Sequence, residues 1–433
     1  MTDGLSQRNG NDTGGTEHRR VVVAGAGMAG VQTAVALREE GWSGGITLIG
    51  AESHQPYDRP PLSKAVLLGK DDGATLDVDF PSLDVDLELG RRATGVDTER
   101  RLLLTDQGAE PYDHLVIATG AEAIRLPGAE PGAGTPAVHL LRTLDDAVRL
   151  RSVLAEQRDI VVVGAGWIGA EFATAAREAG CAVTVVEAAD RPLAGALPPE
   201  IAAYMAGWYL DSGAELVTGA RVLAVEEGGV RIAGGAPSGS GQEPAGTLLP
   251  AGAVVVGIGA RPATGWLAGS GIELAGDRSV RADQWLRTSA PDVYAVGDCA
   301  SFPSTRYGER LLIHHWDNAL QGPRTVAANL VGAQRPHFTG TVYDPVPYFW
   351  SEQFGRFVQY AGHHAGADEL VWRGDPSGSA WTVCWLREGG LVALLAVGRP
   401  RDLAQGRKLI ERSAAIDRVR AADAATPLKA AVL

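Results

Sequence analysis

A chain of 433 residues is too long for one ordinary hydrophobic core, so we expect two or three domains. With 45% hydrophobic and 21% charged residues, its composition is that of a globular protein. The net charge of -13 argues against nucleic-acid binding, which requires a basic surface, but does not exclude an acidic protein partner.

The three cysteines, Cys181, Cys299 and Cys384, are far apart and form no CxxC pair. This spacing supports neither a disulfide framework nor a zinc ribbon, so we predict no metal site and a reducing, cytoplasmic location. No stretch approaches the roughly 18 apolar residues that a membrane-spanning helix needs. Arg19 and Arg20 resemble an export signal only superficially, because the apolar run that follows them breaks at Gly25.

The N-terminal half of the chain begins with one βαβ unit. The polar, glycine-rich residues 1–18 predict a disordered leader. Arg20–Ala24 then predicts a buried strand, Gly30–Glu40 a helix with one apolar face, and Ile46–Ile49 a second strand. His114–Ala118 is a further apolar strand.

The same cycle recurs later, with a strand at Ile160–Val163, a helix at Ala170–Glu178 and a strand at Ala182–Val186. From Val342 onward, aromatic strand-like segments precede a helical run at Asp402–Ser413, which predicts a separate antiparallel α+β domain. The sequence therefore indicates two copies of one α/β architecture, followed by a different third domain.

Each βαβ unit carries a GxGxxG finger between its first strand and its helix, the context in which this motif binds a dinucleotide pyrophosphate. In such a finger the first glycine makes the tight turn, the second admits the pyrophosphate, and the third allows close helix packing. The first finger is Gly25, Ala26, Gly27, Met28, Ala29 and Gly30, and the second is Gly164, Ala165, Gly166, Trp167, Ile168 and Gly169.

An acidic residue follows each finger, just past the second strand, where a carboxylate can bind ribose hydroxyls. These residues are Glu52 and Glu187. A carboxylate at Glu187 favours a free 2′-hydroxyl and repels a 2′-phosphate, so NADH is predicted as the donor in preference to NADPH. Arg191 lies close in sequence and could weaken this preference.

Several motifs taken together resemble a known family. Besides the first finger they are Pro56–Lys64 (PYDRPPLSK), Ala118–Gly120, Leu141–Leu144, Gly257–Pro262, Val296–Asp298 and Phe349–Ser351 (FWS). They resemble the FAD-dependent NAD(P)H ferredoxin reductases of bacterial oxygenase systems, of the putidaredoxin reductase and dioxygenase ferredoxin reductase type. The resemblance extends from about Arg20 to Lys429, and PPLSK combined with FWS is specific to this branch of the glutathione-reductase-like fold.

The resemblance implies an α/β fold, with two Rossmann-like dinucleotide-binding domains and a C-terminal α+β domain. The expected FAD-binding domain is discontinuous and comprises residues 19–140 and 265–335. The NAD(H)-binding domain is expected at 141–264 and the C-terminal domain at 336–433.

The resemblance also assigns residues to FAD. Lys64 is similar to a lysine at the reactive edge of the isoalloxazine, where its ammonium can stabilise negative charge, and Asp298 to an aspartate on the ribityl chain. Without the family motifs, Lys64 and Arg142 would be interpreted as surface cations and Asp298 as a helix N-cap. In addition to the first finger, the expected FAD contacts are Glu52, Arg59, Lys64, Ala93, Ala118, Thr119, Gly120, Arg142, Gly297, Asp298, His315, Trp316 and Trp350.

A second set is assigned to NAD. Trp167 is expected to shield the flavin until the nicotinamide displaces it, or else to serve local packing. Glu171 is expected beside the nicotinamide, or else as a partner of its helix dipole. The expected NAD contacts are Gly164, Gly166, Trp167, Ile168, Gly169, Glu171, Glu187 and Gly259, and the expected catalytic residues are Lys64, Trp167, Glu171 and His315.

The segment Ile313–Ala319 departs from the family pattern. His314 stands where the family has a glutamate, so the polar contact usually made by that glutamate is in doubt. His314 and His315 are both still expected near the flavin and the nicotinamide, and the alternative for His314 is an ordinary core or surface histidine. Gly322-Pro323 predicts an interruption of the helix that follows.

The implied function is an enzyme that passes electrons from NADH through FAD to a [2Fe-2S] ferredoxin or rubredoxin serving a cytochrome P450 or Rieske oxygenase. No cysteine precedes Gly180, which argues against the disulfide reductases and cysteine peroxidases of this fold. Two alternatives are an NADH-binding sensor resembling apoptosis-inducing factor and a cysteine-less NADH oxidase. A basic docking patch for an acidic partner is predicted at Arg306, Arg310, Arg399, Arg401, Arg407, Lys408 and Arg412, unless these charges are merely solvated.

Overall fold

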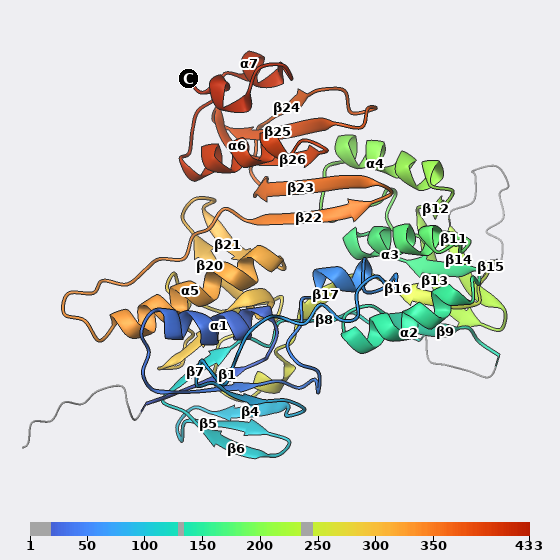
Figure 1. The fold of residues 1–433 in the computed structure, drawn as a ribbon. Coiled ribbons are helices and arrows are strands. Elements are labelled where there is room, and N and C mark those ends of the chain that lie inside the picture. The colour runs from blue at the N-terminus through green and yellow to red at the C-terminus, as the bar shows by residue number, and fades with distance from the viewer. Residues whose placement is uncertain (1–18, 129–133, 235–245) are drawn as a thin grey trace, which may run out of the picture.

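The computed structural model describes residues 19–128, 134–234 and 246–433 (Figure 1). The predicted leader at residues 1–18 lies outside the described residues. Within the described ranges, no helix is long and apolar enough to cross a membrane.

The first βαβ unit forms as predicted. Helix α1 (Met28–Glu39) joins two parallel strands, and its start at Met28 shows that the last residues of the glycine finger already belong to the first helical turn. The strands form one five-stranded sheet in the order β19-β7-β1-β2-β3. Their bounds are β1 (Arg20–Ala24), β2 (Gly45–Ile49), β3 (Asp86–Glu88), β7 (His114–Ile117) and β19 (Val293–Ala295).

The second βαβ unit builds a five-stranded parallel sheet in the order β12-β11-β10-β16-β9. Its strands are β9 (Ala137–Leu140), β10 (Ile160–Val163), β11 (Val183–Val186), β12 (Glu215–Val217) and β16 (Ala253–Val256), and its helices are α2 (Leu144–Ala155), α3 (Trp167–Glu178) and α4 (Pro199–Asp211). The predicted boundary at residue 140 assigns β9 to the first domain, whereas β9 hydrogen-bonds to β16 of this sheet.

The C-terminal domain is an antiparallel sheet in the order β22-β23-β26-β25-β24. One face packs against helix α6, and the other packs against α4 and the Leu193–Leu197 turn of the second domain, as the upper part of Figure 1 shows. The elements are β22 (Tyr348–Gln353), β23 (Arg356–Gly362), β24 (Glu369–Arg373), β25 (Trp381–Arg387), β26 (Gly390–Val397), α6 (Pro400–Glu411) and α7 (Arg418–Ala422). Burial on both faces explains why β26 reads as a nearly continuous apolar run.

Smaller elements complete the fold. The strands are β4 (Ala93–Asp97), β5 (Leu102–Thr105), β6 (Gly108–Pro111), β8 (Ala121–Ala123), β13 (Ala220–Glu226), β14 (Gly229–Gly234), β15 (Thr247–Pro250), β17 (Ala260–Pro262), β18 (Val280–Arg281), β20 (Ala300–Ser304) and β21 (Glu309–Leu312). The short 3-10 helices are η2 (Pro60–Ser63), η3 (Gly265–Leu267), η4 (Gly297–Cys299) and η5 (Leu428–Ala431). The antiparallel pair β8–β17 joins the two segments that connect the first and second domains.

Helix α5 (Trp316–Gly332) passes through Pro323 without a break, so the predicted interruption is wrong. A proline inside a helix removes one hydrogen bond and costs about 3 kcal/mol. Val326 and Leu330 bury their side chains against α1, and each such burial contributes about 1.5–3 kcal/mol, so the packing outweighs the proline. This long-range contact is not visible in the local sequence.

Candidate cofactor-binding site

A cavity of about 1260 Å³ lies where the three domains meet. Both glycine fingers line it, and Phe349 and Trp350 of β22 reach it from the C-terminal domain. Pockets for a single small ligand have volumes of about 300–1,000 Å³, so this cavity has room for more than one such group.

Most of the residues that the sequence assigns to the two cofactors line this cavity. From the FAD set these are Gly25, Ala26, Gly27, Met28, Ala29, Glu52, Arg59, Lys64, Ala93, Ala118, Thr119, Gly120, Arg142, Asp298, His315, Trp316 and Trp350. From the NAD set they are Gly164, Gly166, Trp167, Ile168, Glu171, Glu187 and Gly259. Gly30, Gly169 and Gly297 do not line the cavity.

The third glycine of each finger, at Gly30 and Gly169, serves packing. A Cβ at Gly30 would lie 1.8 Å from the Gly25 carbonyl oxygen, and one at Gly169 would lie 2.0 Å from that of Gly164. Only glycine lets the helix pack this closely on the turn that precedes it.

The second glycine of each finger lies in open space. A Cβ at Gly27 meets no atom within 4 Å, and one at Gly166 meets only the Gly257 carbonyl oxygen at 3.9 Å. Both residues are the N-caps of their helices. Because glycine has no side chain to accept a hydrogen bond, the first amides of each helix lack a capping acceptor. Packing within the protein does not require glycine here, whereas a pyrophosphate approaching the helix N-terminus does.

Glu187 is fixed at the end of β11 by two backbone amides. Its Oε2 accepts a hydrogen bond from the Ala165 amide at 2.8 Å, and its Oε1 accepts one from the Ala189 amide at 2.9 Å. Arg191 pairs with Asp190 at 2.6 Å. The carboxylate therefore has a defined orientation at the cavity wall, and Arg191 has an acidic partner of its own.

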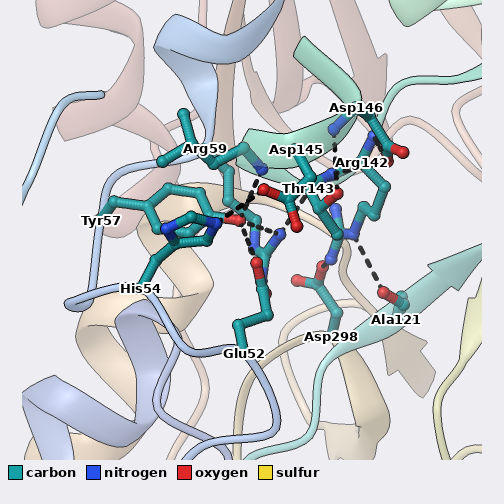
Figure 2. A network of polar contacts seen from close by, with 11 residues as sticks. Glu52, His54, Tyr57, Arg59, Ala121, Arg142, Thr143, Asp145, Asp146 and Asp298 are labelled. Carbon is teal, nitrogen blue, oxygen red and sulfur yellow. Dashed lines mark hydrogen bonds and ion pairs between the residues drawn. The ribbon is translucent and has the colours of Figure 1, made fainter. Parts of the chain in front are cut away.

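Around Glu52, the predicted FAD residues form one connected network (Figure 2). Glu52 Oε1 lies 2.7 Å from Arg59 Nη2, and Arg59 Nη1 donates to the Arg142 carbonyl at 2.6 Å. Arg142 in turn pairs with Asp298 at 3.1 Å. Asp298 lies in η4, whereas the N-cap of α5 is His315, so Asp298 does not cap the long helix that follows.

Lys64 and Glu171 form a buried ion pair in which Nζ lies 2.7 Å from Oε2. Glu171 is only 5% exposed, and it also accepts hydrogen bonds from Ser63 at 2.5 Å and from Ser351 at 2.7 Å. The ion pair and the two hydrogen bonds together stabilise the buried carboxylate, because an unpaired buried charge is strongly destabilising. Ser63 and Ser351 are not among the predicted site residues, although both lie inside the motifs PPLSK and FWS.

An aromatic wall closes the cavity toward the C-terminal domain. The Trp167 ring packs edge-on against Phe349, with centroids 4.8 Å apart, and the His315 ring lies 4.7 Å from Phe349 on a tilted plane. Trp316 packs edge-on against Trp350 at 5.6 Å. Trp167 thus lines the cavity and packs locally at the same time, so its two predicted roles are compatible.

His314 and His315 both line the cavity, and each has one ring nitrogen that makes no hydrogen bond within the described residues. The Nε2 atom of His314 and the Nδ1 atom of His315 are buried without a hydrogen-bond partner among the described residues. Burial lowers the pKa of His314 below its usual range and lowers the pKa of His315 to about 4, so both rings are neutral at pH 7. Two neutral rings in the lining place no charge of their own beside a group bound in the cavity.

All three cysteines lie among the described residues, are free and buried, and do not line the cavity. Cys299, next to Asp298, contacts the Val296 carbonyl through Sγ at 3.3 Å, and burial raises its thiol pKa to about 11. A protonated, enclosed thiol is unsuited to redox exchange.

Four members of the predicted basic patch are engaged inside the protein. Arg306 and Arg310 donate to backbone carbonyls, while Arg399 pairs with Asp402 and Arg407 with Asp317. The remaining three, Arg401, Lys408 and Arg412, are exposed on α6 or directly after it.

The sequence is similar to known proteins over nearly its whole length. Residues 19–322 match the family of pyridine nucleotide-disulphide oxidoreductases, and residues 348–432 match the reductase C-terminal domain. Rhodocoxin reductase of Rhodococcus erythropolis is 38% identical over 95% of this chain and 94% of its own length. The ferredoxin–NAD(+) reductase component of the p-cumate 2,3-dioxygenase system of Pseudomonas putida is 34% identical over 96% of this chain and 99% of its own.

A solved structure, the covalent putidaredoxin reductase–putidaredoxin complex, matches with a TM-score of 0.86 at 30% identity and covers 95% of this chain and 97% of that chain. The predicted fold class, two dinucleotide-binding domains with a C-terminal domain, is thereby confirmed. The chain belongs to the pyridine nucleotide-disulphide oxidoreductase family, in the branch of the ferredoxin reductases of oxygenase systems.

Proposed function

We propose that this protein passes electrons from NADH through FAD to a small [2Fe-2S] ferredoxin, or to a rubredoxin, of an oxygenase system. Two nucleotide fingers that open into one cavity, with no cysteine in its lining, carry this proposal. Without a redox cysteine beside the cofactors, the electrons need an acceptor outside the chain. The reductase relatives, among them the dioxygenase component and putidaredoxin reductase, support a ferredoxin as that acceptor.

The two acidic residues bind and orient the cofactors. The first finger and Glu52 hold FAD, and the second finger and Glu187 hold the nicotinamide dinucleotide, with each carboxylate receiving ribose hydroxyls. The fixed Glu187 carboxylate also selects NADH, because a 2′-phosphate would bring like charge against it. Arg191 pairs with Asp190 and does not line the cavity.

FAD supplies the conversion between the two-electron chemistry of NADH and the one-electron chemistry of an iron–sulfur centre. The residues that line the cavity supply the charge and the shape that FAD and the nicotinamide require. Lys64, held by Glu171, places a positive charge at the wall, and the ring of Trp167 covers the place where the nicotinamide must enter. The rings of His315 and Phe349 pack against each other at that end of the cavity, and burial keeps the His315 ring neutral.

Anaerobic rapid mixing of the FAD-loaded protein with NADH tests this function. Loss of flavin absorbance within milliseconds, followed by fast recovery when a [2Fe-2S] ferredoxin from a bacterial oxygenase system is added, is the expected result. A reduced complex that persists for minutes with ferredoxin present would indicate an NADH-binding sensor instead. Fast recovery with oxygen alone, with one peroxide formed per NADH, would indicate an NADH oxidase.

A further inference from the structure

The hydroxyl of Tyr57 occupies the centre of the network around Glu52 (Figure 2). It donates to Glu52 Oε2 at 2.6 Å and accepts hydrogen bonds from the Leu144 amide at 2.9 Å and from Arg59 Nη1 at 3.1 Å. The side chain is 5% exposed, and burial raises the pKa of the phenol to about 12. The hydroxyl therefore keeps its proton at neutral pH, and its hydrogen-bonding capacity is filled.

The partners of this hydroxyl belong to two different domains. Glu52 lies just past β2 of the first sheet and lines the cavity, with about a third (32%) of its side chain exposed. Leu144 is the first residue of α2 in the second domain, and its amide is one of the helix N-terminal donors that need an acceptor outside the helix. The same two segments meet again at the surface, where His54 lies 2.7 Å from Asp145.

The phenol also limits how the Glu52 carboxylate can turn. One carboxylate oxygen is bound by Arg59 and the other by Tyr57, so its lone pairs toward the cavity have a fixed direction. Without the hydroxyl, Oε2 would be free to rotate toward water, and the Leu144 amide would lose its acceptor. Loss of the hydroxyl would therefore affect the orientation of Glu52 and the hydrogen bonding of the Leu144 amide together.

We propose that Tyr57 is a positioning residue that orients Glu52 for the FAD ribose and couples FAD binding to the start of α2 through its hydroxyl. The coupling rests on the proposed function only in assigning the first finger to FAD. It has two consequences that a merely structural tyrosine lacks. The effect of removing the hydroxyl must depend on Glu52, and it must reach the Leu144 amide.

Titration of the apoprotein with FAD measures the first consequence. Tyr57→Phe should raise the Kd for FAD about tenfold. This ratio corresponds to the lower end of the free energy expected for a hydrogen bond to a charged group, because Glu52 is partly exposed. In a Glu52→Ala background the same substitution should change Kd by less than about twofold. Tyr112→Phe is the matched control, since Tyr112 is also 5% exposed and its hydroxyl has no partner among the described residues.

Hydrogen exchange of the FAD-loaded protein measures the second consequence and does not need the Glu52 variant to fold. The Leu144 amide should exchange faster in Tyr57→Phe and at the wild-type rate in Tyr112→Phe. An unchanged FAD Kd in Tyr57→Phe, an equal effect in both Glu52 backgrounds, or unchanged exchange at Leu144 would each overturn the proposal. None of these measurements involves a ferredoxin, so they can fail while the reductase function stands; wild-type protein that binds no FAD would contradict that function itself.

Discussion

The Glu171 carboxylate is almost completely buried. An ammonium group and a hydroxyl group from the other two domains bind it. Lys64 comes from the first domain, Glu171 from α3 of the second and Ser351 from β22 of the third. Lys64 and Ser351 lie in the PPLSK and FWS motifs, and Glu171 follows the second finger by two residues. Their pairing was not predictable, because Ser351 and Glu171 are 180 positions apart and only the folded chain brings them together.

Breaking this ion pair should destabilise the protein strongly. Lys64→Met leaves Glu171 buried and unpaired, which should cost about 3–5 kcal/mol in the free energy of unfolding. Adding Glu171→Gln should recover much of the loss, since no uncompensated charge then remains. Denaturant unfolding of both variants checks this, with Lys70→Met as the control, because Lys70 pairs with Glu178 at the surface and should contribute below about 1 kcal/mol. Equal stability of the Lys64 single and double variants would refute the account.

Glu187 should determine the choice of nicotinamide cofactor. Glu187→Ala removes the ribose acceptor and the repulsion of a 2′-phosphate, so the NADH/NADPH ratio of kcat/KM should fall about tenfold or more. Glu215→Ala, at a strand outside the cavity lining, should leave the ratio unchanged. A ratio that does not move in Glu187→Ala would disprove the assignment.

His315 should make the apoprotein sensitive to mild acid. Its pKa of about 4 in the folded protein lies below that of an exposed histidine, so the unfolded chain binds the extra proton first. The stability that this histidine contributes is complete above about pH 6.5 and is lost as the pH falls toward 4. Between pH 6.5 and 5, the apoprotein should lose about 1.5 kcal/mol more than its His315→Gln variant. Parallel pH profiles of the two proteins in denaturant unfolding would contradict this.

Among the elements, those set by local periodicity were predictable and those set by tertiary contacts were not. The predicted strands at Arg20–Ala24 and Ile160–Val163 match β1 and β10. Helices α1 and α3 begin two or three residues earlier than predicted, because the finger turns directly into the helix. The failure at Pro323 has a different cause, since the burial of α5 against α1 outweighs the local cost of the proline.

The first residue of α3 should control entry of the nicotinamide. Trp167 leans on Phe349 and lines the cavity, so Trp167→Ala should open the wall and lower the Kd for NAD(+) several-fold. Trp167→Phe keeps an aromatic ring and should stay close to the wild type. Equilibrium titration and rapid mixing with NADH check both variants, and identical affinity and reduction rate in Trp167→Ala would count against a gate.

At the scale of the whole molecule, the cavity depends on all three domains. The two βαβ units supply the fingers, and the C-terminal sheet, packed on α4, places Phe349 and Trp350 against the cavity. The sequence alone predicted this three-part architecture, because each domain has its own periodicity and motifs. It could not predict how residues such as Tyr57 tie the domains together, since the donor at Leu144 is a backbone amide that carries no sequence signal.

Anaerobic reduction of a [2Fe-2S] ferredoxin by NADH, with the FAD-loaded protein in catalytic amount, measures whether this protein delivers electrons from NADH to an iron–sulfur protein. Many ferredoxin molecules should be reduced per FAD, and the reaction should stop when either FAD or NADH is withheld. Rapid reduction of the flavin by NADH without any reduction of ferredoxins from oxygenase systems would contradict the proposed function.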